Sequence, residues 1–178
     1  MVSKKKSGLA KAPAQAVAFT SEQLIGILAM LNEGDTNVIK SGEEQLKPFL
    51  KHHSCIVQLI SVLSNCPNEI VRLQAALLLK KKIGSHFKSF TVAEQDYLKE
   101  TLLTIGKSEP DRNCQIGIVG CIANLAKVVF GVEGGAWPAL FQTLLVLGQE
   151  GNSPALRALN FSLLEQVSLI FSSFSFTF

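Results

Sequence analysis

The sequence has 178 residues, of which 47% are hydrophobic and 17% are charged, enough apolar mass for one folded domain and too much for a largely disordered chain. The net charge of +3 at pH 7 is too small to indicate a phosphate-binding surface, so direct binding of nucleic acid is not expected. The four cysteines have neither the paired spacing of a zinc site nor the density of a disulfide scaffold. They indicate a reducing compartment.

Residues 1–18 are rich in Lys and Ala and are predicted to form a flexible basic leader. The apolar run 14–19 is too short for the core of a signal peptide. A second candidate, 116–130, is shorter than the roughly 18 residues of a membrane span and contains Asn124 and Lys127. We therefore expect no membrane insertion.

From Ser21 onward, apolar residues recur at spacings of three and four, and no segment alternates with period two. Ser21 is expected to cap the first helix, and Asp35 or Thr36 the second. Gly and Pro separate the segments. This pattern predicts eight helices, at 21–32, 36–50, 54–65, 69–83, 91–105, 110–130, 137–148 and from 153 onward.

Local signals define several helix ends. Thr91 and Glu94 have the spacing of a capping box, and Gly106 is expected to end the helix that they open. Tyr97 is placed on the core face of that helix, and Trp137 is expected to pack between repeats. His52 and His53 stand at a helix boundary, where capping is their expected role.

Paired as hairpins, the eight helices form units of about forty residues, the length of HEAT or armadillo repeats. The pairs Val71-Arg72, Cys114-Gln115 and Leu156-Arg157 lie 43 and 42 residues apart at the start of successive second helices. The sequence thus predicts an all-α, right-handed superhelix, a solenoid of about four repeats, over residues 19–171. Such a stack presents a surface for partners, although the fold alone assigns no function.

The last residues, 172–178, are predicted to form an irregular tail rich in Phe and Ser. They supply no polar capping helix, and a solenoid end needs a polar outer face to stay soluble. We therefore expect the chain to be a truncated or alternatively ended piece of a longer protein.

Two submotifs carry a family resemblance. The motif Asp-x-x-Val-x-x-x-Gly-Glu-Glu-Gln-Leu-Lys at 35–47 resembles the first long helix of the importin beta (karyopherin) nuclear transport receptors. The motif Val-Arg-x-x-Ala-Ala-x-x-Leu-Lys-x-x-Ile at 71–83 resembles the second-repeat signature of the same family. Segments 93–99 and 136–140 are similar to its third and fourth repeats. The triple lysine at 80–82 is similar to the branch that imports histones and ribosomal proteins.

The resemblance implies an N-terminal arch whose second helices bind the GTP form of the small GTPase Ran. The residues implied as Ran contacts are Arg72, Lys80, Lys81 and Lys82. Nucleoporins and basic cargo would bind further along a longer receptor, which would move between cytoplasm and nucleus through the nuclear pore.

Each of these features also has a structural interpretation. The three lysines can complete the dipole of a helix end, and Arg72 can hold neighbouring repeats together through carboxylates or carbonyls. Cys114 and Cys121 are expected to be buried small hydrophobes, and the Gly-rich segment 131–135 a turn.

The alternative functions are a generic HEAT scaffold in an enzyme complex and an inactive truncated product. No titratable pair forms a catalytic motif, so an enzyme is not expected, and no cofactor or metal site is predicted.

Overall fold

The computed structural model describes residues 19–132, 135–149 and 153–175. Throughout these residues the chain is helical or irregular and contains no strand, which confirms the all-α prediction. The helices are α1 (Ser21–Met30), α2 (Thr36–Phe49), α3 (Ser54–Asn65), α4 (Glu69–His86), α5 (Val92–Ser108), α6 (Arg112–Phe130), α7 (Pro138–Leu147) and α8 (Pro154–Ser175), with a short 3₁₀ helix η1 (Phe87–Ser89) after α4.

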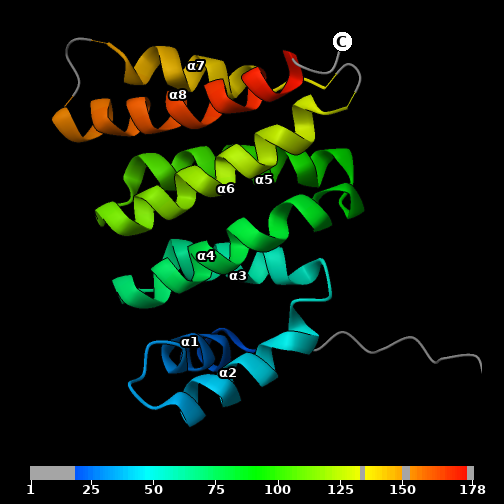
Figure 1. The fold of residues 1–178 in the computed structure, drawn as a ribbon, viewed down its shortest axis with the longest axis vertical. Helices are drawn as coiled ribbons and strands as arrows, with labels where there is room; N and C mark the ends of the chain where they lie inside the picture. Colours follow the sequence, from blue (N-terminus) through cyan, green and yellow to red (C-terminus); the bar gives the residue numbers. More distant parts are fainter. Residues whose placement is uncertain (1–18, 133–134, 150–152, 176–178) are drawn as a thin grey trace, which may run out of the picture.

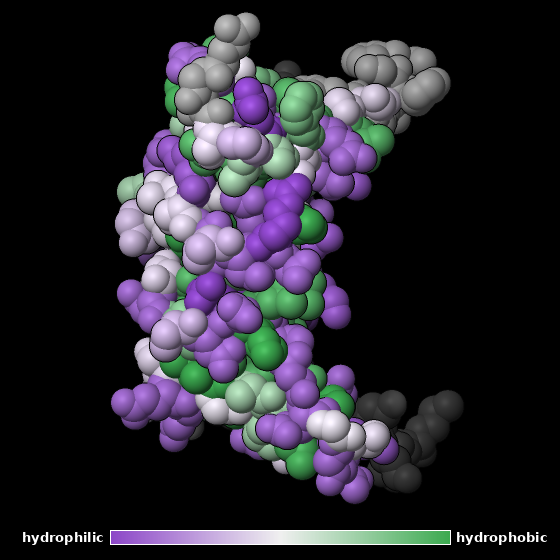
Figure 2. All heavy atoms as spheres, turned by 90° about the vertical axis from the view of Figure 1, so that its left-hand side faces the viewer, coloured by the Kyte–Doolittle hydropathy of each residue, from purple (hydrophilic) through white to green (hydrophobic). Residues whose placement is uncertain are grey.

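The helices form four antiparallel hairpins stacked along one axis, with α1, α3, α5 and α7 in one layer and α2, α4, α6 and α8 in the other (Figure 1). The main contacts between hairpins run along the second layer, from α4 to α6 and from α6 to α8. Figure 2 shows a crescent whose hollow side corresponds to the viewer's side in Figure 1, so the second helices line the concave face. The solenoid prediction is therefore confirmed.

Side-chain caps define most helix starts. Thr20, one residue before the predicted cap, forms a capping box with Gln23 at the start of α1. Asp35 caps α2 and Asn68 caps α4 by accepting hydrogen bonds from backbone N–H groups of the first turn. The predicted capping box of Thr91 and Glu94 opens α5. These interactions are local, which is why the sequence predicts them well.

Two predicted helix ends are wrong. Gly106 does not end α5 but lies buried inside it, where a Cβ atom would approach Cγ2 of Ile118 to 3.3 Å, so this glycine lets α6 pack closely. The predicted irregular tail is helical as far as Ser175. No helix breaker stands in this segment, and the Ser168 and Ser172 hydroxyls donate to carbonyls of the preceding turn. Residues 1–18 and 176–178 lie outside the described residues.

Helix α6 is the centre of the core, with α4 on one side and α8 on the other. By length and composition, α6 is long and apolar enough to cross a membrane. However, 67% of its most apolar 18-residue stretch is buried within the stack, as expected for a core helix. Trp137 is buried, as predicted, with 2% of its surface exposed. Tyr97, predicted to be in the core, is 67% exposed, because α5 turns its other face toward α6.

All four cysteines are buried and reduced. Burial raises the pKa of the Cys121 thiol to about 12 and that of the Cys55 thiol to about 11. We predict that a thiol reagent such as DTNB reacts with the native chain only as fast as the fold opens, and rapidly after unfolding in urea. Fast labelling of any of the four thiols under native conditions would contradict this burial.

Candidate functional site

The concave face carries an excess of positive charge on its two central helices. An anionic protein surface would be attracted there, because clustered charge of one sign steers association. Apart from Arg72, which pairs with Glu109, α4 and α6 carry five basic side chains and one acid: Lys80, Lys81, Lys82, Arg112 and Lys127 against Glu69.

A groove of about 460 Å³ runs between α2 and α4. Lys81 and Lys82 from α4 line it together with Glu43 and Lys47 from α2. Its other lining side chains are mainly apolar and include Leu77, which is 39% exposed. The groove thus combines apolar surface with cations at its edge, a composition suited to a protein partner.

Lys80 points in a different direction from the groove. Its side chain lies over Gly120 of α6, where an added Cβ atom would meet Cδ and Cε of Lys80 at 2.8 Å. The Asn124 amide donates a hydrogen bond of 2.8 Å to the Lys80 carbonyl, which fixes α4 to α6 at this level. Successive helix positions differ by about 100°, so the three lysines form two sites rather than one patch.

Arg72 joins two hairpins from inside the stack. Its Nε and Nη2 donate to both carboxylate oxygens of Glu109 at 3.1 and 2.8 Å, and its Nη1 donates to the carbonyls of Cys66 and Pro67 at 2.9 and 3.0 Å. The two charged side chains are 12% and 3% exposed. The guanidinium is therefore occupied by contacts within the chain, in line with the structural interpretation of this residue.

Glu109 was not identified from the sequence as a site residue. Burial raises the pKa of its carboxyl, but the hydrogen bonds from Arg72 and from the backbone N–H of Asp111, together with the Arg72 charge, outweigh burial and leave the pKa below its ordinary value. One feature of the sequence could have identified Glu109: it stands two residues before Asp111, which caps the inner helix α6. Its partner lies 37 residues away, which sequence spacing does not reveal.

The histidines have structural roles. The predicted capping role of His52 and His53 is wrong, because the start of α3 has no side-chain cap; the His53 ring instead packs edge-on against Phe90, with centroids 5.3 Å apart. His86 hydrogen-bonds the Leu50 carbonyl at 3.1 Å, linking the second hairpin to the first. In the part of the chain that the structure describes, His, Cys, Asp and Glu form no group of three suited to a metal ion.

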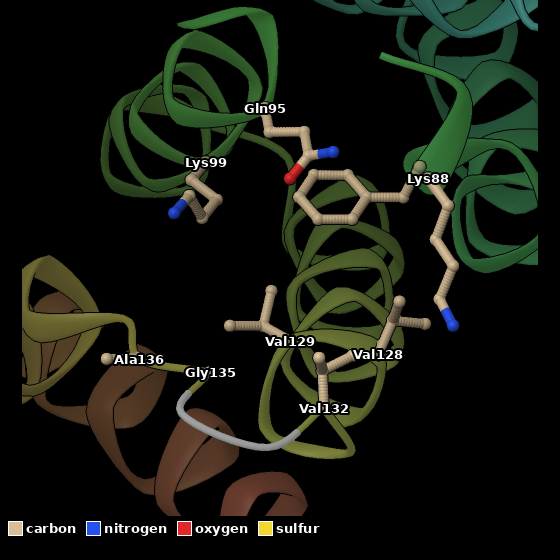
Figure 3. Close-up of a pocket in the computed structure, with 9 residues that line it drawn as sticks. Lys88, Gln95, Lys99, Val128, Val129, Val132, Gly135 and Ala136 are labelled. Carbon is tan, nitrogen blue, oxygen red and sulfur yellow. The ribbon is translucent and has the colours of Figure 1, made fainter. Parts of the chain in front are cut away.

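A second hollow, of about 420 Å³, lies where η1, α5 and the end of α6 meet. Figure 3 shows Gln95 and Lys99 from α5 on one side and Val129 and Val132 on the other. Lys99 already pairs with Asp96 at 2.6 Å. Lys88 is the other cation in its lining, and none of the residues named by the family resemblance lies there, so we place the candidate site on the concave face, where Lys81 and Lys82 line the groove.

Fold and site together define the class of protein as a curved helical solenoid with lysines on its inner helices. The profile of the Importin-beta N-terminal domain matches residues 42–105. Human Importin-4 is 26% identical over 109 residues, covering 61% of this chain and 10% of its own length. Mouse Importin-4 is 24% identical over 129 residues, covering 72% of this chain and 12% of its own length.

Solved structures support the same fold. A crystal structure of Kap121p bound to RanGTP superposes with a TM-score of 0.69 at 19% identity, covering 85% of this chain and 15% of that one. Kap121p bound to Pho4p gives a TM-score of 0.68, also at 19% identity, covering 86% of this chain and 15% of that one.

The chain is therefore similar to the N-terminal region of the importin-beta family over residues 42–105, and it shares the helical solenoid fold of Kap121p. The chain spans about a tenth of the length of the curated relatives that it matches.

Proposed function

We propose that this chain is a Ran-binding arch of a nuclear import receptor and that its concave face grips Ran in the GTP state. The observation that supports this most strongly is the cationic inner surface of α4 and α6, next to the groove lined by Lys81 and Lys82. The similarity in fold to Kap121p, whose structure was solved with RanGTP, supports the same partner. The proposed partner surface is therefore protein and anionic.

The proposal gives the four predicted residues different roles. Lys81 and Lys82 contact Ran from the α2–α4 groove, and Lys80 contacts it from above Gly120. Arg72 supports binding indirectly, because its hydrogen bonds to Glu109 set the spacing of the second and third hairpins. A partner that spans both hairpins depends on that spacing.

A receptor that binds one nucleotide state of Ran gains a switch from the difference in affinity between the two states. Cargo and nucleoporins are proposed to bind other parts of a longer receptor, which works in the cytoplasm and the nucleus. The similarity to Importin-4 and the lysines at 80–82 support the branch that imports histones and ribosomal proteins.

The nucleotide state of Ran provides the direct test. Immobilised Ran loaded with a non-hydrolysable GTP analogue should capture the chain, and Ran loaded with GDP should not. Affinity should fall as salt is raised, because the contacts are ionic. Equal capture of both forms, or of neither, would refute the proposal.

Charge reversal at the groove tests the assigned residues. Exposed ion pairs are worth up to about 1 kcal/mol each, so Lys81→Glu with Lys82→Glu should weaken binding of GTP-loaded Ran by about tenfold or more. Lys107→Glu, an exposed change on the outer helix α5, serves as the matched control and should leave affinity unchanged. Calorimetric titration measures the affinity of both variants for GTP-loaded Ran. An equal loss of affinity in the double variant and in the control would show that the contact lies elsewhere.

A further inference from the structure

The groove between α2 and α4 lies where two neighbouring second helices fail to pack against each other. Helix α4 contacts the first hairpin mainly through α1, whereas α6 packs directly on α4 and α8 packs directly on α6. The α2–α4 groove, of about 460 Å³, occupies the space that remains between the first two second helices. This difference between successive hairpins requires a cause in the sequence.

The register of the repeats identifies the residues that keep α2 away from α4. On α6, Gly117 and Gly120 face α4, because an added Cβ atom would meet side chains of α4 at 2.9 Å and 2.8 Å respectively. One 43-residue repeat earlier, Gln74 and Leu77 stand at the same positions of α4, and both line the α2–α4 groove. Glycines therefore allow close packing between α4 and α6, and larger side chains prevent it between α2 and α4.

The next repeat supports this register. Ser162 of α8 lies 42 residues after Gly120, and its hydroxyl accepts a hydrogen bond of 3.3 Å from Arg112 of α6. The position thus faces the preceding hairpin in α6 and in α8, and it carries a small residue in both. Leu77 is the large residue at this position, and 39% of its surface is exposed. That exposed part is available to a partner.

Two hydrogen bonds hold the groove open at a fixed width. Near the start of α4, the Gln74 amide donates a bond of 2.9 Å to Oδ1 of Asn32, in the turn after α1. At the end of α4, His86 hydrogen-bonds the Leu50 carbonyl at 3.1 Å. The groove is therefore formed before any partner binds, which reduces the entropic cost of binding.

The charge of the lining indicates the chemistry of the occupant. Three lysines and one acid line the groove: Lys47, Lys81 and Lys82 against Glu43. The remaining lining side chains are leucine, isoleucine and Gln74. A partner segment that carries an apolar side chain next to carboxylates complements both the apolar surface and the excess of cations.

We propose that the α2–α4 groove receives an apolar side chain of the partner, flanked by carboxylates, and that Leu77 is its anchor. This inference rests on the proposed function, because the occupant is a segment of GTP-loaded Ran. Contact with Leu77 sets how long the complex lasts, since a few well-packed anchors dominate binding energy and act on dissociation. The lysines set how fast the complex forms, since charges around a contact steer association.

Binding kinetics separate these two roles. Ran loaded with a non-hydrolysable GTP analogue is immobilised, and the rates of association and dissociation of the full chain are measured by surface plasmon resonance at several salt concentrations. Leu77→Ala should speed dissociation about tenfold and leave the association rate unchanged. Leu77→Met keeps the apolar volume and should dissociate at nearly the wild-type rate. The double variant K81E/K82E should slow association, and salt should reduce that effect.

Ile70→Ala is the matched control. Ile70 lies seven residues before Leu77 on the same face of α4 and is 49% exposed, but it does not line the groove. Its replacement should change neither rate. Circular dichroism of each variant shows whether the helices are retained.

The outcomes distinguish this inference from the proposed function. If GTP-loaded Ran failed to bind the wild-type chain, the proposed function would be wrong, and the inference with it. If the wild-type chain bound but Leu77→Ala dissociated no faster, or Ile70→Ala dissociated equally fast, the inference alone would be overturned.

Discussion

Replacing Arg72 with alanine is expected to destabilise the chain by about 3 kcal/mol, because removing one partner of a buried ion pair leaves the other charge uncompensated. Glu109 would keep its buried carboxylate, and the carbonyls of Cys66 and Pro67 would each lose a donor. Urea unfolding followed by circular dichroism measures the loss. Lys107→Ala, exposed on α5, is the control and should change stability by less than about 0.5 kcal/mol.

The charge of Glu109 accounts for part of that loss, and a second variant isolates it. In R72A/E109Q the glutamine is neutral and can still accept from the backbone N–H of Asp111, so the double variant should be more stable than R72A alone. A double variant no more stable than R72A would show that packing of the Arg72 stem, rather than charge, dominates.

The same pair predicts a pH dependence. The pKa of Glu109 is lower in the folded chain than its ordinary value of about 4.3, so the pair stabilises the fold fully above that value. Its contribution is lost as the pH falls through the lower folded pKa, where the carboxylate takes up a proton. The difference between wild type and R72A should therefore be largest near neutral pH and shrink in acid. A difference independent of pH would contradict the assignment.

Local signals predicted most of the fold. The capping box of Thr91 and Glu94 and the cap at Asp35 involve residues two or three positions apart, so the sequence contains both partners side by side. The sequence predictions were wrong where packing against a distant segment determines the local structure. Gly106 looks like a helix stop, yet its missing side chain makes room for Ile118 of the next helix.

The candidate site was predictable only in part for the same reason. The sequence identified Arg72 and the lysines by pattern, but the partner of Arg72 and the glycine beneath Lys80 lie about forty residues away. The spacing of residues along one helix does not show which neighbouring helix each side chain packs against. The separation of Lys81 and Lys82, which line the α2–α4 groove, from Lys80, which lies over Gly120, became visible only in the stacked hairpins.

Gly117 is the position where an added side chain should cost most. A Cβ atom there would lie 2.9 Å from Cβ of Ala76, closer than two such atoms approach, so α4 and α6 would have to separate. Overpacking of this kind costs about 1–3 kcal/mol, while alanine gains about 1 kcal/mol of helix propensity over glycine. Gly117→Ala should lose about 1 kcal/mol net, and the bulkier Gly117→Val about 3 kcal/mol.

Two other glycines serve as matched controls for this effect. Gly26 in α1 has no atom within 4 Å of an added Cβ, so Gly26→Ala should gain roughly 0.5–1 kcal/mol. At Gly120 the obstacle is the flexible Lys80 side chain, which can swing aside, so Gly120→Ala should keep its stability but displace the ammonium group. It should therefore weaken binding of GTP-loaded Ran without a change in urea midpoint. If Gly117→Ala were as stabilising as Gly26→Ala, the close α4–α6 contact would be wrong, and with it the position assigned to Lys80.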